Sequence, residues 1–183
     1  MKTFAGLLSI FFLFASCNVV LNPAGEVNNL IKNGSFEENG KPSLKNWFGE
    51  DSSNAKLVKD APERGGSWSV ALPTHWFGPI YLFLAQEVKL QSGMHILQFS
   101  FWAKNRRTHG TAELVVKTND DKFIVEKYIV IRDSSWQQYT TLDTVQLQKG
   151  EKLYVNLSGG GSEVAGGETN FDLISLTEVS KNK

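Results

Sequence analysis

The side chains best suited to contact a ligand lie on the outward faces of three strand-like runs. Apolar and polar residues alternate in two of these runs, and in the third Glu113 and Lys117 point outward if Leu114 and Val116 are core, since successive side chains of a β-strand point to opposite faces. Aromatic rings stack on the C–H faces of sugars, while amides and carboxylates hydrogen-bond to sugar hydroxyls, so such faces could bind carbohydrate. The outward residues are Gln98, Ser100 and Trp102 in His95–Lys104; Lys152, Tyr154 and Asn156 in Lys152–Leu157; and Glu113 and Lys117 in Ala112–Thr118.

Two loop-like stretches add aromatic and cationic side chains. The stretch Thr74–Pro79 carries Trp76 beside Phe77, and exposed aromatic residues on loops are typical of binding sites. The stretch Lys104–Gly110 carries Arg106, which could hydrogen-bond to a hydroxyl or to the carboxylate of a uronic acid. The plainer interpretations are an aromatic cluster that caps the core and a solvated cationic loop.

Catalytic patterns are weak, and we expect a protein that is not an enzyme. The histidines at positions 75, 95 and 109 lack metal-ligand spacing, and the sequence has no G-x-S-x-G nucleophile motif. Glycoside hydrolysis needs two carboxylates placed across the scissile bond. Acidic residues are frequent enough, but no local pattern singles out such a pair.

Composition and charge favour one globular domain without a polyelectrolyte partner. The chain has 183 residues, of which 41% are hydrophobic, with 12 Phe and 5 Trp, enough for a sizeable core. Nineteen Lys and Arg balance nineteen Asp and Glu. Because there is no basic stripe, we expect no nucleic-acid partner.

The first sixteen residues have the layout of a secretory signal peptide. Lys2 precedes the almost wholly apolar segment Phe4–Ala15, and small residues lead to Cys17, the single cysteine. The position of Cys17 after Phe14, Ala15 and Ser16 resembles a bacterial lipobox, whose cysteine becomes the lipidated first residue. The alternative to a signal peptide is a transmembrane anchor. The alternative to a lipobox is a plain signal peptide with an incidental cysteine.

These features predict an exported protein held in the bacterial cell envelope. Residues 17–26 would form the lipidated N-terminus and a tether, with Pro23 and Gly25 keeping it irregular. Residues 27–179 would be one domain and residues 180–183 a tail. We expect a lipid anchor in the outer membrane or at the cell surface, or otherwise secretion.

The domain reads as a series of short strands, which is typical of an antiparallel sandwich or barrel. Helical periodicity is absent, and the turn-forming residues Gly, Asn, Asp and Ser separate the runs. The expected strands are Asn29–Phe36, Lys56–Lys59, Trp68–Leu72, Ile80–Leu90, His95–Lys104, Ala112–Thr118, Phe123–Ile131, Gln137–Gln146, Lys152–Leu157 and Phe171–Glu178.

Several motifs occur in the order and spacing of a known family. The chain resembles carbohydrate-binding modules of families four, nine and twenty-two, which are antiparallel β-sandwiches with the galactose-binding-like jelly-roll fold. The matching segments are Leu30–Glu37 followed by Trp47, Gly65–Val70, Gln86–Val88 with Gly93, Phe99–Lys104, Trp136–Tyr139 and Phe171–Leu176. The fold hosts other binding roles, so it does not by itself fix the ligand.

The resemblance implies that the three outward faces described above form one concave, glycan-binding sheet face. Trp102 and Tyr154 would be stacking platforms, and the alternative for Trp102 is packing under a neighbouring loop. Trp47, Trp68 and Trp136 match core positions. The expected ligand-binding set is Trp102, Tyr154, Asn156, Gln98, Glu113, Lys152, Trp76 and Arg106.

The resemblance also implies a structural calcium ion. Its positions match Glu37 and Asp172, which lie near opposite ends of the domain sequence. Calcium prefers several oxygen ligands, and carbonyl groups near Gly65–Ser67 could complete the shell. The alternative is that both carboxylates make ordinary hydrogen bonds or face solvent.

The expected function is therefore non-catalytic binding of a poly- or oligosaccharide by a lipid-anchored envelope protein. A structural or adhesion module with a protein partner in the cell envelope is the alternative. It would present a broad apolar patch, for example around Trp76, Phe77 and Tyr81.

Overall fold

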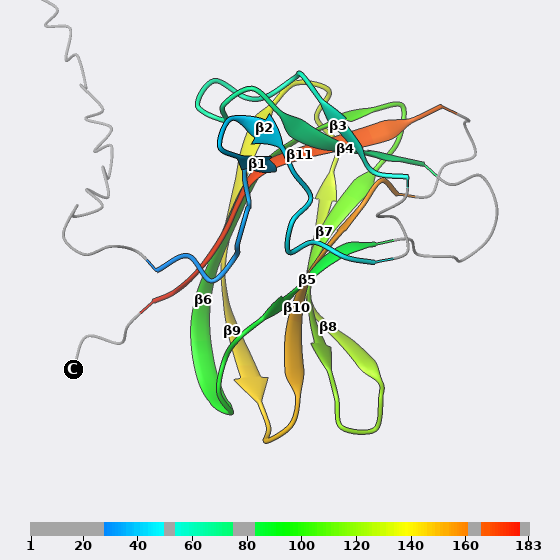
Figure 1. Ribbon diagram of the computed structural model, residues 1–183. Helices are drawn as coiled ribbons and strands as arrows, with labels where there is room; N and C mark the ends of the chain where they lie inside the picture. Colours follow the sequence, from blue (N-terminus) through cyan, green and yellow to red (C-terminus); the bar gives the residue numbers. More distant parts are fainter. Residues whose placement is uncertain (1–27, 50–53, 75–82, 161–165, 180–183) are drawn as a thin grey trace, which may run out of the picture.

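The computed structural model describes residues 28–49, 54–74, 83–160 and 166–179, and within them it contains strands and no helix. Two large sheets lie against each other as layers, with β6 and β9 on the left and β10 and β8 on the right in Figure 1. The strands are β1 (Glu37–Glu38), β2 (Lys41–Pro42), β3 (Lys56–Val58), β4 (Ser69–Pro73), β5 (Leu84–Val88), β6 (Gly93–Arg106), β7 (Gly110–Lys117), β8 (Phe123–Ile131), β9 (Gln137–Leu147), β10 (Lys152–Ser158) and β11 (Glu168–Glu178).

The predicted antiparallel β-sandwich is confirmed. One sheet has the strand order β3-β4-β11-β6-β9, the other has the order β5-β10-β7-β8, and all neighbours are antiparallel. A small hairpin joins β1 to β2. Consecutive strands β5 and β6 belong to different sheets, so the turn between them carries the chain from one layer to the other.

The core lies between the two sheets and is built by period-two alternation. Along β6, Leu97, Phe99, Phe101 and Ala103 are fully buried, while the residues between them are half-buried. The Phe101 ring stacks on Tyr139 with a centroid distance of 5.2 Å. This packing turns the alternate residues of β6 to the outer surface of the five-stranded sheet.

Most expected strands are present, but the expected strand Asn29–Phe36 is wrong. This segment makes one isolated bridge, between Asn29 and Thr177, and then continues as bends and turns. Asn33 and Phe36 have φ angles of 54° and 53°, in the left-handed region that breaks a strand. Of the expected strand Ile80–Leu90, residues 84–88 form β5, and residues 80–82 lie outside the described part.

Segment 29–36, the blue trace in Figure 1, ties the two sheets together at one side of the sandwich. The Leu30 N–H donates to Leu176 O of β11 at 2.8 Å. The buried amide of Gln86, on edge strand β5, accepts from Lys32 N–H at 2.7 Å and donates to Lys32 O at 2.8 Å. The Gln86 side chain thus pairs with the segment's backbone as a neighbouring strand would.

The three tryptophans expected in the core differ in burial. Trp47 is buried, and its indole N–H donates to Asn33 O at 3.0 Å. Trp68 and Trp136 are half-buried, and the Lys104 ammonium lies over the Trp136 ring at 5.2 Å.

Within the described ranges, no helix has the length and apolar content needed to cross a bilayer.

We expect Gln86→Leu to lower the free energy of unfolding by about 2 kcal/mol, because it removes both hydrogen bonds between the buried Gln86 amide and the backbone of Lys32. The measurement is chemical denaturation. Gln98→Leu makes the same change at a half-buried position on the outer face of β6 and should shift stability by less than about 0.5 kcal/mol. Equal denaturation midpoints for the two variants would contradict this role of Gln86.

Candidate ligand-binding groove

The outer face of the four-stranded sheet carries a groove whose side chains lie in rows across the strands. Successive outward residues on one strand are about 6.6 Å apart, which sets the spacing of the rows. The rows, in the order β5, β10, β7, β8, are Ala85, Asn156, Glu113 and Tyr128; then Glu87, Tyr154, Val115 and Val125; then, from β10 onward, Lys152, Lys117 and Phe123.

The groove has a volume of about 690 Å³, and five of its twelve lining residues are aromatic. Phe48 packs edge-to-face against Tyr154, with ring centroids 6.2 Å apart and an interplanar angle of 81°. Phe123 and Tyr128 of β8 are exposed. Such a cavity suits a ligand that offers apolar faces for ring stacking. The lining residues are Phe48, Gly49, Phe83, Ala85, Glu113, Val115, Lys117, Phe123, Val125, Tyr128, Tyr154 and Asn156.

Backbone contacts hold the loop residue Phe48 at the groove. Phe48 N–H donates to Ala85 O at 2.9 Å, and Ala85 N–H donates to Phe48 O at 2.6 Å. Gly49 follows with a φ of 127°, and a Cβ atom there would lie 2.1 Å from Phe83 O. Glycine is therefore required at position 49, where the loop passes close to the chain that leads into β5.

Glu113 and Asn156 form a polar floor. They are directly opposite each other on β7 and β10 and are 5% and 8% exposed. Thr111 Oγ1 donates to Glu113 Oε1 at 3.2 Å. Burial raises the pKa of the Glu113 carboxyl, and this hydrogen bond lowers it by a smaller amount. No other described residue hydrogen-bonds to the Asn156 amide, which lines the groove. A carboxyl and an amide are thus available to a ligand.

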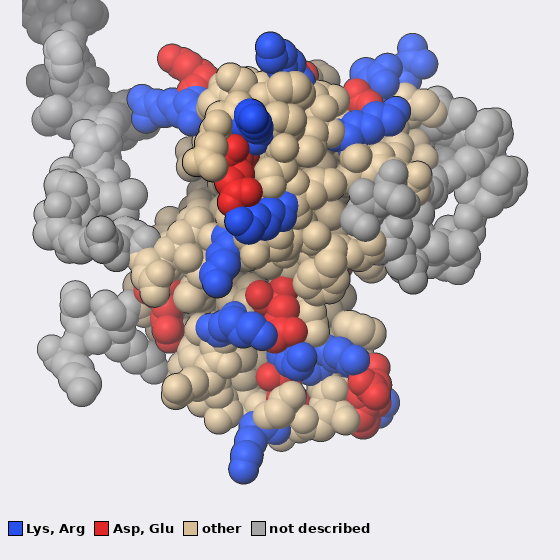
Figure 2. All heavy atoms as spheres, in the orientation of Figure 1, with Lys and Arg blue, Asp and Glu red and all other residues tan. Residues whose placement is uncertain are grey.

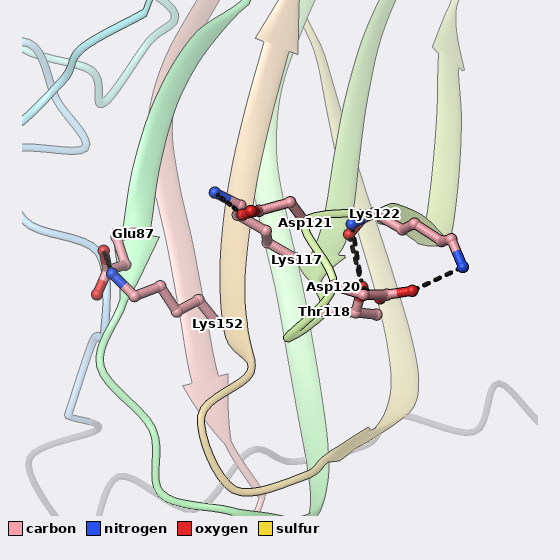
Figure 3. A network of polar contacts seen from close by, with 7 residues as sticks. All are labelled: Glu87, Lys117, Thr118, Asp120, Asp121, Lys122 and Lys152. Atoms are coloured by element: carbon pink, nitrogen blue, oxygen red, sulfur yellow. Dashed lines mark hydrogen bonds and ion pairs between the residues drawn. The ribbon is translucent and has the colours of Figure 1, made fainter.

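Paired charges mark the third row, as Figure 3 shows. Lys152 Nζ lies 3.1 Å from Glu87 Oε2, and Lys117 Nζ lies 2.7 Å from Asp121 Oδ1. The hydrogen bond from Lys89, helped by a smaller contribution from Lys152, lowers the pKa of Glu87, and burial opposes this change. The lysines at this end of the groove therefore have carboxylate partners. Figure 2 shows the same intermixing of acidic and basic side chains over one face of the molecule.

The structure brings together some of the expected site residues and separates others. Tyr154, Asn156 and Glu113 line the groove, and Lys152 lies at its charged end. The expectation that Gln98 and Trp102 share this face is wrong, because β6 belongs to the five-stranded sheet and its outward residues point away from the groove. Sequence alternation gives the face of a strand but not the sheet to which the strand belongs.

The two loop residues of the expected set do not join the described groove. Arg106, at the end of β6, is exposed and pairs with Glu168 of β11, with Nε 3.3 Å from Oε1. Trp76 lies outside the described residues, as do Phe77 and Tyr81.

Sequence reasoning missed most of the aromatic lining. Phe123–Ile131 was expected as a strand, and strict alternation from Phe123 would turn Lys127 to the groove. A bulge at Glu126 shifts the register, so that Val125 faces Val115 but Tyr128 faces Glu113. The alternation up to Val125 was a usable signal, whereas Phe48 and Phe83 lie in loops without a repeating pattern.

The two carboxylates expected to bind metal approach the same turn. Glu37 Oε1 accepts from Trp68 N–H at 2.6 Å and from Ser67 N–H. Asp172 is fully buried; Leu173 N–H donates to its Oδ1 at 2.7 Å, and no described residue hydrogen-bonds to its Oδ2. Burial raises the pKa of Asp172 to about 8, and the nearby Glu37 carboxylate adds to this.

The setting of Asp172 fits a cation. Its partnerless oxygen faces Gly65, where a Cβ atom would lie 2.1 Å from Oδ2, and a Cβ atom on Gly66 would lie 2.8 Å from both Glu37 oxygens. Among the described residues, no third His, Cys, Asp or Glu joins this pair. Any further protein ligand from that part of the chain would be a carbonyl, amide or hydroxyl oxygen, which calcium accepts.

Solved structures share this fold at low sequence identity. No family model and no curated protein matches the sequence. A family 16 carbohydrate-binding module superposes with a TM-score of 0.58 at 18% identity, covering 82% of this chain and 100% of the module. A CBM4 structure gives 0.53 at 19% identity, covering 81% and 99%.

An arabinose-bound GH51 α-L-arabinofuranosidase gives a TM-score of 0.59 at 19% identity over 86% of this chain. The present chain spans 27% of the length of that enzyme. At these identities the likeness shows the fold alone, and it agrees with the jelly-roll sandwich expected from the sequence.

We expect Glu113→Gln to stabilise the protein at pH 8, on the order of 1 kcal/mol, and to have little effect at pH 4. As pH rises above the ordinary value of 4.5, the unfolded chain ionises at Glu113 before the folded one does, because the folded pKa is raised. The wild type therefore loses stability over that range, and glutamine does not. Melting curves at both pH values test this, with Glu126→Gln on exposed β8 as the control. An equal gain at both pH values would count against it.

Proposed function

We propose that this protein binds a poly- or oligosaccharide through the groove on the four-stranded sheet, without cleaving it. The observation that carries the proposal is the combination of aromatic rings with a carboxyl and an amide in one cavity of about 690 Å³. Sugar C–H faces would stack on Tyr154 and Phe48, and sugar hydroxyls would hydrogen-bond to Glu113 and Asn156.

The comparisons support carbohydrate as the ligand class. Proteins of the same fold include structures named as carbohydrate-binding modules of families 16 and 4. The sequence motifs point to the same group. The binding set differs from the expected one: Tyr154, Asn156 and Glu113 remain, Phe48, Tyr128 and Phe123 are added, and Lys152 stays at the rim.

A non-catalytic role fits the acidic groups of the groove. Glu113 is the one carboxylic acid among the described lining residues, and glycoside hydrolysis uses two. The same fold occurs as part of an arabinofuranosidase chain, so catalysis by a further domain or partner is compatible with this binding role.

We also propose that the protein is exported and lipid-anchored in the cell envelope through Cys17. The support is the order of basic, apolar and small residues before Cys17. The described chain begins beside β11, where Asn29 pairs with Thr177 in the five-stranded sheet. A tether attached there would leave the groove, on the other sheet, open to a glycan or to a protein partner in the envelope.

A structural calcium ion is proposed at Glu37 and Asp172. It would neutralise two neighbouring carboxylates and supply the partner that Asp172 Oδ2 lacks. The ion would join the start of the domain to β11 and the turn at residues 65–68.

Affinity electrophoresis of the purified protein in β-glucan, xylan, mannan and pectin gels tests glycan binding. Tyr154→Ala should weaken binding roughly 30-fold, about 2 kcal/mol, because it removes a central stacking ring. Trp102→Ala removes a larger ring on the other sheet and should change affinity less than about twofold. Thermal melts confirm that both variants are folded.

Loss of binding in both variants, or in neither, would contradict the proposed groove. If no polymer is retarded, the adhesion or structural role with a protein partner becomes the better explanation, and the exposed apolar residues of β8 are where that partner should be sought.

For the metal, we expect calcium to raise the melting temperature and a chelator to reverse the change, since an ion that binds only the folded state stabilises it. At a concentration of 100 Kd the gain is about 2.7 kcal/mol. Asp172→Asn should abolish the calcium-dependent part. Glu38→Gln, which changes an exposed neighbour of Glu37, should retain it. A wild-type melting temperature that is insensitive to both calcium and chelator rules the ion out.

A further inference from the structure

Glu113 is a buried acid that has no cationic partner among the described residues. Its side chain is on the groove floor, 5% exposed, and Thr111 is the neighbour that hydrogen-bonds to it, through Oε1. None of the cationic side chains in the described ranges forms an ion pair with it. A buried carboxylate with spare acceptor capacity needs a donor, and a bound ligand can supply one.

Asn156 provides a second unused group at the same level. Its amide faces Glu113 across adjacent strands, at a separation typical of directly opposite residues, about 5 Å between Cβ atoms. An amide both donates and accepts, whereas an ionised carboxylate only accepts. The pair therefore matches two neighbouring hydroxyl groups of a sugar. One hydroxyl would donate to the Glu113 carboxylate, and the other would hydrogen-bond to the Asn156 amide.

Cations elsewhere in the groove do not offset the charge of Glu113. Lys117 and Lys152 lie four residues away along β7 and β10, two rows along the face, and each is paired with its own carboxylate, Asp121 or Glu87. Two rows separate their Cα atoms from the floor by about 13 Å, and their own carboxylates already offset their charges.

We propose that Glu113 and Asn156 make the groove selective for a neutral sugar ring with adjacent free hydroxyls and against rings that carry a carboxylate or sulfate. This inference rests on the proposed glycan binding and names the class of glycan. An anionic substituent at the floor would meet the Glu113 carboxylate within a few ångströms in a partly water-excluded site, where like charges repel strongly. Arg106, which could have hydrogen-bonded to a uronic acid, pairs with Glu168 on the other sheet and does not offset this charge.

The test compares polymers that share a backbone and differ in charge. The pairs are hydroxyethylcellulose and carboxymethylcellulose, arabinoxylan and glucuronoxylan, and methyl-esterified and de-esterified polygalacturonic acid. For the purified protein, the dissociation constant for each member is measured by affinity electrophoresis or calorimetry at pH 8. The readout is the ratio of the dissociation constant for the anionic member to that for the neutral member of the same pair.

We expect at least tenfold weaker binding of the anionic member by the wild type, with the ratio narrowing in 0.5 M salt. Glu113→Gln removes the negative charge and should reduce the ratio below about threefold, even where it also weakens binding of the neutral member. Asn156→Asp adds a negative charge to the floor and should widen the ratio. Gln98→Glu adds the same charge to the outer face of the other sheet and should leave the ratio unchanged.

Several outcomes would overturn the inference. They are equal binding of both members by the wild type, a ratio that a folded Glu113→Gln variant or high salt leaves unchanged, or a preference for the anionic member. The last would move the specificity to Lys117 and Lys152. The salt dependence of the wild-type ratio decides the matter even if a variant fails to fold. If the wild type binds no polymer of any pair, glycan binding itself fails, which is distinct from binding without charge selection.

Discussion

The alternation of side chains across two stacked sheets is the constraint on which the rest of this structure depends. Each strand gives one set of side chains to the shared core and turns the other set outward, away from the opposite sheet. Because β6 fills the core with Leu97, Phe99 and Phe101, its outward residues must lie on the far side of the molecule from those of β7 and β10. A ligand groove can therefore draw on one sheet and its loops, and here the four-stranded sheet has the aromatic residues.

That constraint explains which parts of the site could be predicted from sequence. Tyr154, Asn156 and Glu113 follow from alternation within one strand, which depends on local sequence alone. The assignment of β6 to the other sheet, the bulge at Glu126 and the approach of Phe48 to β5 depend on pairing between distant segments, which a local pattern does not contain. Segment 29–36 is an expected strand that instead links the sheets, because Lys32 pairs with the Gln86 side chain and Asn33 and Phe36 have left-handed angles.

The link and the carboxylate pair belong to the same region of the molecule. Segment 29–36 leads directly into Glu37, and the Ile174 N–H of β11, next to the bulge after Asp172, donates to Gly34 O. A Cβ atom on Gly34 would lie 2.0 Å from Ile174 O, so the close approach depends on glycine. Two acidic side chains from opposite ends of the domain are in this way held against one turn. The repulsion between them works against the packing that brings them together, and a bound cation would remove that conflict.

The groove has rigid aromatic rings and a polar floor, and these two parts should contribute differently to the choice of sugar. Phe48 is fixed by two backbone hydrogen bonds to Ala85, and Tyr154 stands on a central strand, so the stacking surfaces lose little freedom when a ligand binds. Stacking on such rings discriminates weakly among sugars, since most pyranose rings offer a C–H face. Lys152 and Lys117, at the charged end of the groove, already pair with Glu87 and Asp121. The floor residues Glu113 and Asn156 have hydrogen-bonding capacity that no described residue uses fully, and a ligand that fails to satisfy a buried polar group incurs a large penalty. Specificity in this groove should therefore come from its polar floor, with the aromatic walls contributing most of the affinity.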